Sequence, residues 1–558
     1  MAQTKSLSKS RLKFSPVGFA DTRLFYRIFE ILPGLITWIF LLSPILLSFV
    51  MPIAVAYFII AFDLFWLLKS VRMSYSLLLG YRRMRETEAV NWNNRLHELD
   101  HLESTLRHAQ DRYARAVDRK AGKAHIKSLK QEVERLQLLV KHETTILPPK
   151  DIHHLVIMPL YNETIDVIRP ALQALIDSEY DKKKIFFIFS YEERGGETTK
   201  QTALALEKEY AKYFGEYKTY CHPDGVVGEL KGKGANISFA GKKALKFIRG
   251  KGILEKDVIV TTIDCDHRVH PQYFSRLTYA YCINPNRKHS SFQPLALFNN
   301  NIWDVPAPMR VIATSNSFWV MIESVRQGRL RNFASHAQSL DALIETDFWS
   351  ITSPVEDGHQ FYRSYFTFNG DYMVEPLFLP IYQDAVLAKT YRRTFYAQFK
   401  QLQRWAYGVS DFPYVVKSSV KNKNISFGNK MLQIGRLFEG HFSWATAPLI
   451  LTFAAWAPLY LNISFNRQAI AHQLPIIASN ILTLAMVGLF VTIWISFIMM
   501  PKRPAHVRRH RYIYMVLQWV LVPITAIVFG SFAAISAQTR LMLGKYLGFV
   551  VTEKAVKK

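Results

Sequence analysis

Long stretches without a charged residue constrain the fold of this chain more than any other feature. Three of them are residues 31–62, 474–500 and 512–539. Because a helix needs about 20 apolar residues to cross a bilayer, each stretch is long enough for at least one membrane pass. The first stretch starts too late and runs too long to be a cleaved signal peptide. The sequence therefore predicts a multi-pass membrane protein.

The net charge of +26 is concentrated beside these apolar stretches, which suggests topology as its origin. The positive-inside rule places basic flanks in the cytoplasm, so no nucleic-acid partner is expected. With three cysteines and none at zinc spacing, the soluble part is expected in a reducing compartment. Basic residues precede the first stretch, follow it, and separate the last two: Lys5, Lys9, Arg11, Lys13, Arg23 and Arg27; Lys69, Arg72, Arg82, Arg83 and Arg85; Lys502, Arg503, Arg508, Arg509 and Arg511.

The apolar stretches give an expected order of passes through a cell membrane. After a basic cytoplasmic N-terminus at residues 1–28, a transmembrane hairpin with a basic flank is predicted at residues 29–85, broken near Pro52. Two later passes are predicted at residues 442–461 and 474–500. The stretch 512–539 is long for one pass and short for two, so its path is left open.

Residues 86–147 are polar and follow a helical repeat. Apolar residues recur at spacings of three and four on both sides of Gly122. We therefore predict a coiled-coil-like hairpin of two antiparallel helices, inserted between the membrane anchor and a soluble domain. A spacer or packing arm is the simplest interpretation, and an oligomerisation or regulatory role is the alternative.

From residue 150 to about 390, strand and helix patterns alternate. Apolar runs at residues 155–159, 185–190 and 258–264 predict buried strands, with helical patterns after the first two. This order predicts an α/β fold with a doubly wound, mostly parallel sheet, which binds ligands beyond the carboxyl ends of its strands. Polar and acidic candidates lie there: Asn162, Glu163, Glu192, Glu193, Asp264 and Asp266.

Asp264 and Asp266 follow the third predicted strand. Residues i and i+2 of a strand project to the same side, so the two carboxylates can converge. Two hard oxygen ligands suit a Mg²⁺ or Mn²⁺ ion that holds a diphosphate. Such a D-x-D pair is common, and ordinary loop chemistry is the alternative interpretation.

Three motifs follow one another along the chain: Asp264-Cys265-Asp266, Glu356-Asp357, and Gln401-Leu-Gln-Arg404-Trp405. Between membrane stretches, this set resembles the processive, membrane-embedded family 2 glycosyltransferases, the group that contains cellulose, chitin and hyaluronan synthases. The resemblance spans roughly residues 155–405. It implies a GT-A-type domain at residues 150–390, interfacial helices at 391–441, a transmembrane region at 442–545 and a tail at 546–558.

The resemblance implies donor-binding roles for residues in the first half of the domain. Lys233 resembles the lysine that faces the diphosphate, Asp264 would lie toward the nucleotide, and Asp266, with Asp264, would hold Mg²⁺ or Mn²⁺. Where the family usually has a base-binding aspartate, this chain has Glu192 and Glu193, and one of them would take its place. The segment expected to line base and ribose is Pro159, Tyr161, Asn162 and Glu163.

Later motifs are implied to serve the acceptor and the leaving group. Asp357 resembles the catalytic base, with Glu356 as the weaker candidate; a turn residue or helix cap is the alternative. Arg404 would hold the diphosphate, Trp405 would stack on the acceptor sugar, and Gln401 would position one of them. Without the family, the same three residues suit an amphipathic interfacial helix.

The tail contains Phe549-Val-Val-Thr552-Glu-Lys554, which matches F-x-V-T-x-K. It resembles the gating loop of cellulose synthases, and Thr552 and Lys554 would then contact the diphosphate. This role requires a cytoplasmic tail. If residues 512–539 form one full pass, the tail lies outside and the assignment fails.

The resemblance therefore implies an inverting hexosyltransferase that takes a nucleotide sugar, expected to be UDP-linked, in the cytoplasm. It would extend a growing polysaccharide and move that chain across the membrane, with membrane lipids around it. Two alternatives stay open: addition of a single sugar to a lipid acceptor, and an inactive membrane scaffold. No motif identifies the sugar, the linkage or an accessory subunit.

Overall fold

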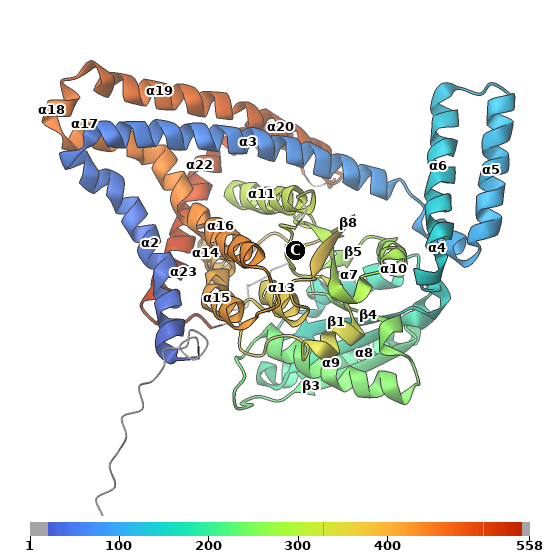
Figure 1. Cartoon of the computed structure of the whole chain (residues 1–558). Helices are drawn as coiled ribbons and strands as arrows, with labels where there is room; N and C mark the ends of the chain where they lie inside the picture. The colour runs from blue at the N-terminus through green and yellow to red at the C-terminus, as the bar shows by residue number, and fades with distance from the viewer. Residues whose placement is uncertain (1–20, 327, 506, 549–558) are drawn as a thin grey trace, which may run out of the picture.

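The computed structural model describes residues 21–326, 328–505 and 507–548. In it, an α/β domain lies beside a group of long apolar helices (Figure 1). The domain is built on an eight-stranded sheet of order β3-β2-β1-β4-β7-β6-β8-β5. The strands are β1 (His153–Leu160), β2 (Ile185–Glu192), β3 (Glu216–His222), β4 (Val258–Thr262), β5 (Arg268–Val269), β6 (Ser290–Leu297), β7 (Ala337–Ser339) and β8 (Met373–Tyr382).

One half of the sheet is parallel, as the alternation of strands and helices predicted. β1 pairs in parallel with β2 and with β4, and β2 pairs in parallel with β3. Successive side chains of β1 enter different cores: Leu155 and Ile157 pack on one face, Val156 and Met158 on the other. Helices cover both faces, which explains why these strands are continuous apolar runs.

The other half corrects the prediction of a mostly parallel sheet. β7 runs antiparallel to both β4 and β6, and β5 runs antiparallel to β8, while β6 and β8 are parallel. The sheet is therefore mixed. β7 has three residues and β5 has two, too few for a period-two pattern, and prolines interrupt β6 and β8.

The helices of the α/β domain alternate with its strands in the first half and gather beyond it in the second. α7, α8 and α10 contribute to one core, and α9 and α12 to the other. The bounds are α7 (Ile165–Ile176), α8 (Gly196–Tyr210), α9 (Lys233–Gly250), α10 (Tyr273–Ile283), α11 (Ala307–Ser324), α12 (Leu340–Glu345), α13 (Glu356–Thr367), α14 (Tyr391–Ala406) and α15 (Asp411–Lys421).

Among the described residues, five helical segments are long and apolar enough to cross a membrane: Arg23–Val50, Pro52–Glu88, Phe427–Leu461, Ala469–Ile498 and Arg511–Met542. The first break falls at Met51, next to the predicted Pro52. Their elements are α2 (Arg23–Val50), α3 (Pro52–Glu88), α16 (Phe427–Phe453), α17 (Ala457–Leu461), α18 (Ile463–Asn466), α19 (Ala469–Ala485), α20 (Val487–Ile498), α21 (Arg511–Leu517), α22 (Val522–Thr525) and α23 (Phe532–Met542).

α16 runs through residue 442, where the boundary between interfacial helices and the transmembrane region is predicted. It begins at Phe427 and continues without interruption into the apolar segment. The residues before 442 are mixed in character because this part of α16 packs on the α/β domain: Glu439 accepts from Lys69 of α3 at 2.6 Å and from Arg329 at 3.1 Å.

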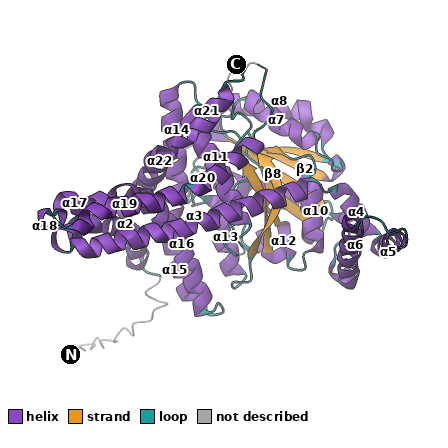
Figure 2. Ribbon diagram, turned by 90° about the horizontal axis from the view of Figure 1, so that it is seen from above, coloured by secondary structure: helices purple, strands orange, loops and turns teal. Residues whose placement is uncertain are grey.

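α3 connects the apolar helices to the α/β domain as one continuous helix. It lies beside α19 and α20 and then passes over α11 (Figures 1 and 2). Near its end, Leu77 and Met84 pack with residues of β6, α11 and β8. A Cβ at Gly80 would lie 2.9 Å from the carbonyl oxygen of Met321, so glycine permits this close approach.

The last apolar segment, Arg511–Met542, begins and ends beside the α/β domain and the start of α2. At its start, Tyr512 packs against Trp303 with ring centroids 5.4 Å apart. At its end, Arg27 donates to the carbonyl oxygen of Leu541 at 2.8 Å, and Tyr546 donates to Glu30 at 3.0 Å. Both ends therefore lie next to the flanks that the charge pattern places in the cytoplasm.

The polar stretch after α3 forms α4 (Trp92–Asp100), α5 (Leu102–Asp118) and α6 (Lys123–Lys141). α5 and α6 lie side by side and project from the α/β domain (Figure 1). The chain turns between them at residues 119–122. α4 holds their base, where the Trp92 backbone amide donates to Gln272 at 2.9 Å.

Candidate active site

Lys233 lies at the centre of an acidic cluster formed by three distant parts of the chain. Its Nζ is 3.0 Å from Asp264 Oδ1, 3.4 Å from Glu356 Oε1 and 3.2 Å from Asp357 Oδ2. Lys233 begins α9, Asp264 follows β4, and the two other carboxylates begin α13. The structure thus brings Lys233 together with residues of the D-x-D motif and of the E-D motif.

A glycine allows the start of α9 to approach α13. A Cβ at Gly234 would lie 2.4 Å from the carbonyl oxygen of Ser350 and 3.1 Å from the Cβ of Glu356. Any side chain here would push the two segments apart. Gly234 therefore permits the close packing of the start of α9 on α13.

The cluster perturbs the ionisation of its own members. Burial alone favours the neutral amine, but Asp264, Asp357 and Glu356 hold the pKa of Lys233 well above its ordinary value. Burial, and then the adjacent charge of Asp357, raise the pKa of Glu356, while Lys233 and Arg404 act in the opposite direction. Arg404 is therefore close enough to act on the cluster, and Glu356 holds its proton more tightly than an ordinary glutamate.

His336 is a buried neighbour of Asp357 that the sequence analysis missed. Its Nδ1 lies 3.6 Å from Asp357 Oδ1 and 2.9 Å from the carbonyl oxygen of Phe333. Its Nε2 accepts from Trp349 Nε1 at 3.3 Å, so the proton lies on Nδ1. Burial lowers the pKa of His336, which keeps the ring neutral. No motif marks this residue, which directly precedes the three-residue strand β7.

Asp266 lies on the other side of the D-x-D segment, in a more enclosed place than Asp264. Its side chain is 3% exposed, against 31% for Asp264. Its Oδ2 accepts from the backbone amide of Asp384 at 3.1 Å. His267 Nε2 lies 3.7 Å from Asp264 and 3.8 Å from Asp266, between the two carboxylates.

The D-x-D pair fits a divalent cation by its donor chemistry. Mg²⁺ in phosphate-transfer sites commonly takes only one or two carboxylates from the protein, with phosphate and water oxygens as further ligands. Two carboxylates meet that requirement. Within residues 21–326, 328–505 and 507–548, no group of three or more His, Cys, Asp or Glu side chains is arranged to hold a metal.

The turn after β1 holds the residues expected to line the nucleoside. Glu163 accepts from the backbone amides of Tyr161 at 3.0 Å and Asn162 at 3.2 Å, so it fixes the shape of this turn. Asn162 is exposed. The carbonyl oxygen of Pro159 accepts from the Cys265 thiol at 3.1 Å, which ties the end of β1 to the D-x-D segment.

Arg194 follows the two glutamates at the end of β2, and the sequence analysis did not single it out. Its guanidinium lies 4.2 Å from the centroid of the Tyr161 ring and forms an ion pair with Glu192. Glu193 instead accepts from the backbone amide of Asp224 at 2.9 Å. Of the two glutamates, Glu192 is therefore the one that pairs with the arginine stacked on Tyr161.

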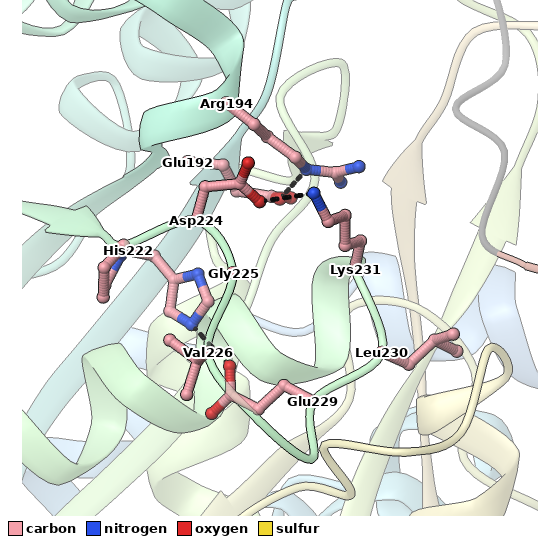
Figure 3. A pocket seen from close by; sticks show the side chains of 10 residues that line it. Glu192, Arg194, His222, Asp224, Gly225, Val226, Glu229, Leu230 and Lys231 are labelled. Atoms are coloured by element: carbon pink, nitrogen blue, oxygen red, sulfur yellow. Dashed lines mark hydrogen bonds and ion pairs between the residues drawn. The ribbon is translucent and has the colours of Figure 1, made fainter.

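A pocket of about 320 Å³ opens beside Arg194 and Glu192 (Figure 3). His222, Asp224, Glu229 and Lys231 line its other sides, and two polar side-chain contacts hold them. Lys231 lies 2.7 Å from Asp224, and His222 lies 3.0 Å from Glu229. The pocket lies at the carboxyl ends of β2 and β3, where an α/β sheet binds ligands.

The Q-x-x-R-W motif lies on α14. Gln401 accepts from Gln398 at 3.1 Å, and the ring of Trp405 packs against Phe298 with centroids 6.1 Å apart. Only Arg404 acts on the carboxylate cluster through its charge. Thr552 and Lys554 lie outside the described residues.

No protein-family model and no curated protein matches the sequence. Three similar solved structures are a mannosyltransferase, PcManGT from Pyrobaculum calidifontis, in complex with GDP-Man and Mn²⁺; S. aureus TarS 1-349 in complex with UDP-GlcNAc; and GalNAc-T7 with UDP, GalNAc and Mn²⁺.

Sequence identities to these structures are 12%, 14% and 10%, and TM-scores are 0.38, 0.34 and 0.31. The alignments cover 71%, 60% and 52% of this chain and 88%, 90% and 58% of the others, in the same order. At this level of similarity, the assignment of a function rests on the side-chain geometry.

Proposed function

We propose that this chain is an inverting glycosyltransferase of the membrane surface, which transfers a sugar from a nucleotide diphosphate donor to a growing polysaccharide. One observation carries the proposal. Lys233 joins Asp264 of the D-x-D motif to Asp357 of the E-D motif through contacts of 3.0 and 3.2 Å. A cation between a donor-side carboxylate and a candidate base is the arrangement that such a transfer needs.

Departure of the nucleoside diphosphate requires positive charge near the developing oxyanion. Lys233 would supply part of it, because its pKa is held high and it stays charged at neutral pH. Arg404 would supply a planar pair of donors. Asp264 and Asp266 would hold Mg²⁺ or Mn²⁺, which supplies further charge to the diphosphate.

Asp357 would remove the proton of the attacking hydroxyl. Glu356 suits this role less well, because its side chain is 3% exposed, against 20% for Asp357. A single displacement by the acceptor oxygen inverts the anomeric centre. The ring of Trp405 would then give the acceptor sugar an apolar face beside Phe298.

The pocket next to Arg194 is the proposed place of the base, with the donor expected to be UDP-linked. The base would lie near Tyr161, where Arg194 now stacks, and Glu192 would position that arginine. Extension of a polysaccharide and its passage through the membrane would use the apolar helices that flank the domain, with the catalytic domain in the cytoplasm. The tail at residues 546–558 would cover the loaded site.

Addition of a single sugar to a lipid acceptor is a second candidate, and one observation favours it. In the most apolar windows of the five long helices, only 11–39% of the residues are buried inside the structure. Helices with so little mutual burial enclose less of a polar path than a tightly packed bundle does. A lipid acceptor would need only access from the side.

The test is transfer by purified protein from a panel of labelled UDP- and GDP-sugars, with Mg²⁺, Mn²⁺ or a chelator, followed by sizing of the product. We expect one donor to be used, activity to depend on the cation, and long products to form. Products with a single added sugar would instead support transfer to a lipid acceptor. Undiminished transfer by Asp357→Asn would contradict the proposed mechanism.

A further inference from the structure

A second cavity, of about 480 Å³, lies where the α/β domain meets two of the apolar helical segments. Phe298, at the end of β6, and Phe318, on α11, form part of its wall. Met499, directly after α20, and Met515, on α21, close it from the other side. Its walls are thus largely apolar, and they come from both the soluble domain and the membrane helices.

Arg310 is the charged residue of this cavity. Arg310 is only 3% exposed, yet none of the residues that line the cavity is acidic. Its Nε donates to Gln518 Oε1 at 2.6 Å and its Nη1 donates to the carbonyl oxygen of Val305 at 2.6 Å. In the described part of the chain, no carboxylate lies within 4.0 Å of this guanidinium.

A buried cation without an anionic partner is costly, because it has lost its hydration without gaining a counter-charge. The two oxygen acceptors at Gln518 and Val305 are neutral, so they satisfy hydrogen bonds but leave the charge uncompensated. Burial, together with the nearby charge of Arg511, lowers the pKa of Arg310 to about 10, which still leaves it charged at neutral pH. An anion in the cavity would offset this cost.

The surroundings favour an anion that carries an apolar chain. Ser496 of α20 and Gln518 line the cavity, and both belong to segments apolar and long enough to cross a membrane. The connection between these segments is strongly basic, with Lys502, Arg503, Arg508 and Arg509. A lipid at this level would place its chains along the apolar helices and its headgroup near Arg310.

We propose that this cavity binds the phosphate group of an anionic membrane lipid, with Arg310 as its counter-ion and Gln518 fixing the guanidinium. The proposal does not depend on the transferase function. It has a consequence for that function, because Phe298 lines the cavity and also packs against Trp405. A bound lipid would hold Phe298 in place, and through it Trp405, the residue proposed to stack on the acceptor sugar.

The experiment measures binding to the full-length protein in a neutral detergent, by native mass spectrometry and by the shift in thermal-unfolding midpoint. Three additives are compared: phosphatidylglycerol, diacylglycerol of the same chain length, and inorganic phosphate. We expect phosphatidylglycerol alone to remain bound and to raise the midpoint. Equal binding of diacylglycerol would contradict recognition of the phosphate group. An equal effect of inorganic phosphate would contradict a lipid as the ligand.

Variants assign the binding to the cavity. Arg310→Gln should weaken phosphatidylglycerol binding at least tenfold, whereas Arg509→Gln, which removes the same charge from an exposed position nearby, should change it less than threefold. Thr314→Phe fills the cavity without altering Arg310 and should also abolish binding. If Arg310→Gln does not fold, lipid binding by Thr314→Phe tests the proposal instead. Binding that survives Thr314→Phe would overturn the proposal.

Discussion

Lys233 Nζ lies 3.2 Å from Asp357 Oδ2, although 124 residues separate the two in the chain. The ammonium group is buried among three carboxylates, so a change at either residue alters the charge balance of the whole cluster. Arg404 reaches the same cluster through Glu356. This relationship makes the cluster testable by single substitutions.

Lys233→Met should lower sugar transfer by about 10²-fold or more, the loss typical of removing one group that stabilises transition-state charge. The remaining carboxylates would also repel the donor diphosphate. Steady-state transfer of a labelled sugar checks this. Lys242→Met, on the same helix and in an exposed ion pair with Asp347, is the control and should stay near the parent activity. Equal losses in both would argue against a role for Lys233.

Asp357→Asn should reduce the rate of transfer by about 10²- to 10⁴-fold, the usual contribution of a general base. The loss should fall on the chemical step more than on donor affinity, because the base acts on the acceptor hydroxyl. Glu356→Gln should cost less, since the Glu356 side chain is 3% exposed, against 20% for Asp357, and is therefore less accessible to an acceptor hydroxyl. Single-turnover rates and nucleotide binding, measured separately, distinguish the two. A larger loss in Glu356→Gln than in Asp357→Asn would mean that Glu356 is the base.

Arg194→Ala should raise the KM for the donor while leaving kcat nearly unchanged, because Arg194 stacks on Tyr161 away from the carboxylate cluster. Discrimination between UDP- and GDP-sugars should also weaken. Competition between the two donors measures this directly. Arg169→Ala removes an exposed arginine paired with Glu209 and should change neither quantity. An unchanged KM in Arg194→Ala would remove the pocket beside it from donor binding.

His154 should make the stability of the α/β domain pH-dependent. Burial lowers its pKa from 6.5 to about 3, and its Nε2 lies 2.8 Å from Thr278 Oγ1. Because the folded state favours the neutral ring, this stability is fully present above pH 6.5 and is lost as the pH falls toward 3. At pH 5 the loss should be about 2 kcal/mol.

Unfolding midpoints of the parent and of His154→Gln between pH 7 and pH 5 check this expectation. The variant should start lower at pH 7 and show a flatter profile. His153→Gln is the matched control at the next position, which is only partly buried, and it should keep most of the pH dependence. Parallel profiles for the parent and His154→Gln would show that another group titrates.

Gly34→Ala should destabilise the contact between α2 and α23. A Cβ at Gly34 would lie 2.9 Å from the carbonyl oxygen of Gln538 and 3.0 Å from the Cβ of Met542. At Gly435 of α16 a Cβ meets no atom within 4 Å, so Gly435→Ala should gain up to about 1 kcal/mol from helix propensity. Unfolding midpoints in detergent should therefore move in opposite directions. A shift in the same direction would mean that α23 does not pack closely on α2.

Several features of this protein could be predicted because their signals are local. Uncharged runs gave the apolar segments, and period-free apolar runs gave β1, β2 and β4. The convergence of Asp264 with Lys233 and Asp357 joins three distant parts of the chain and has no such local signal. The features that escaped prediction, such as His336 and Arg194, lie in short or irregular segments without a repeating pattern.

By itself, the sequence determined which residues must leave water and which short segments end at the carboxyl edge of a buried strand. Those properties depend on neighbours a few residues away. Only the tertiary structure decided that β7 runs antiparallel between β4 and β6, that the last apolar segment returns to the start of α2, and that Arg310 is buried with no carboxylate of the described residues within 4.0 Å. Each of these depends on contacts between residues far apart in the chain, which leave no periodic trace in the sequence.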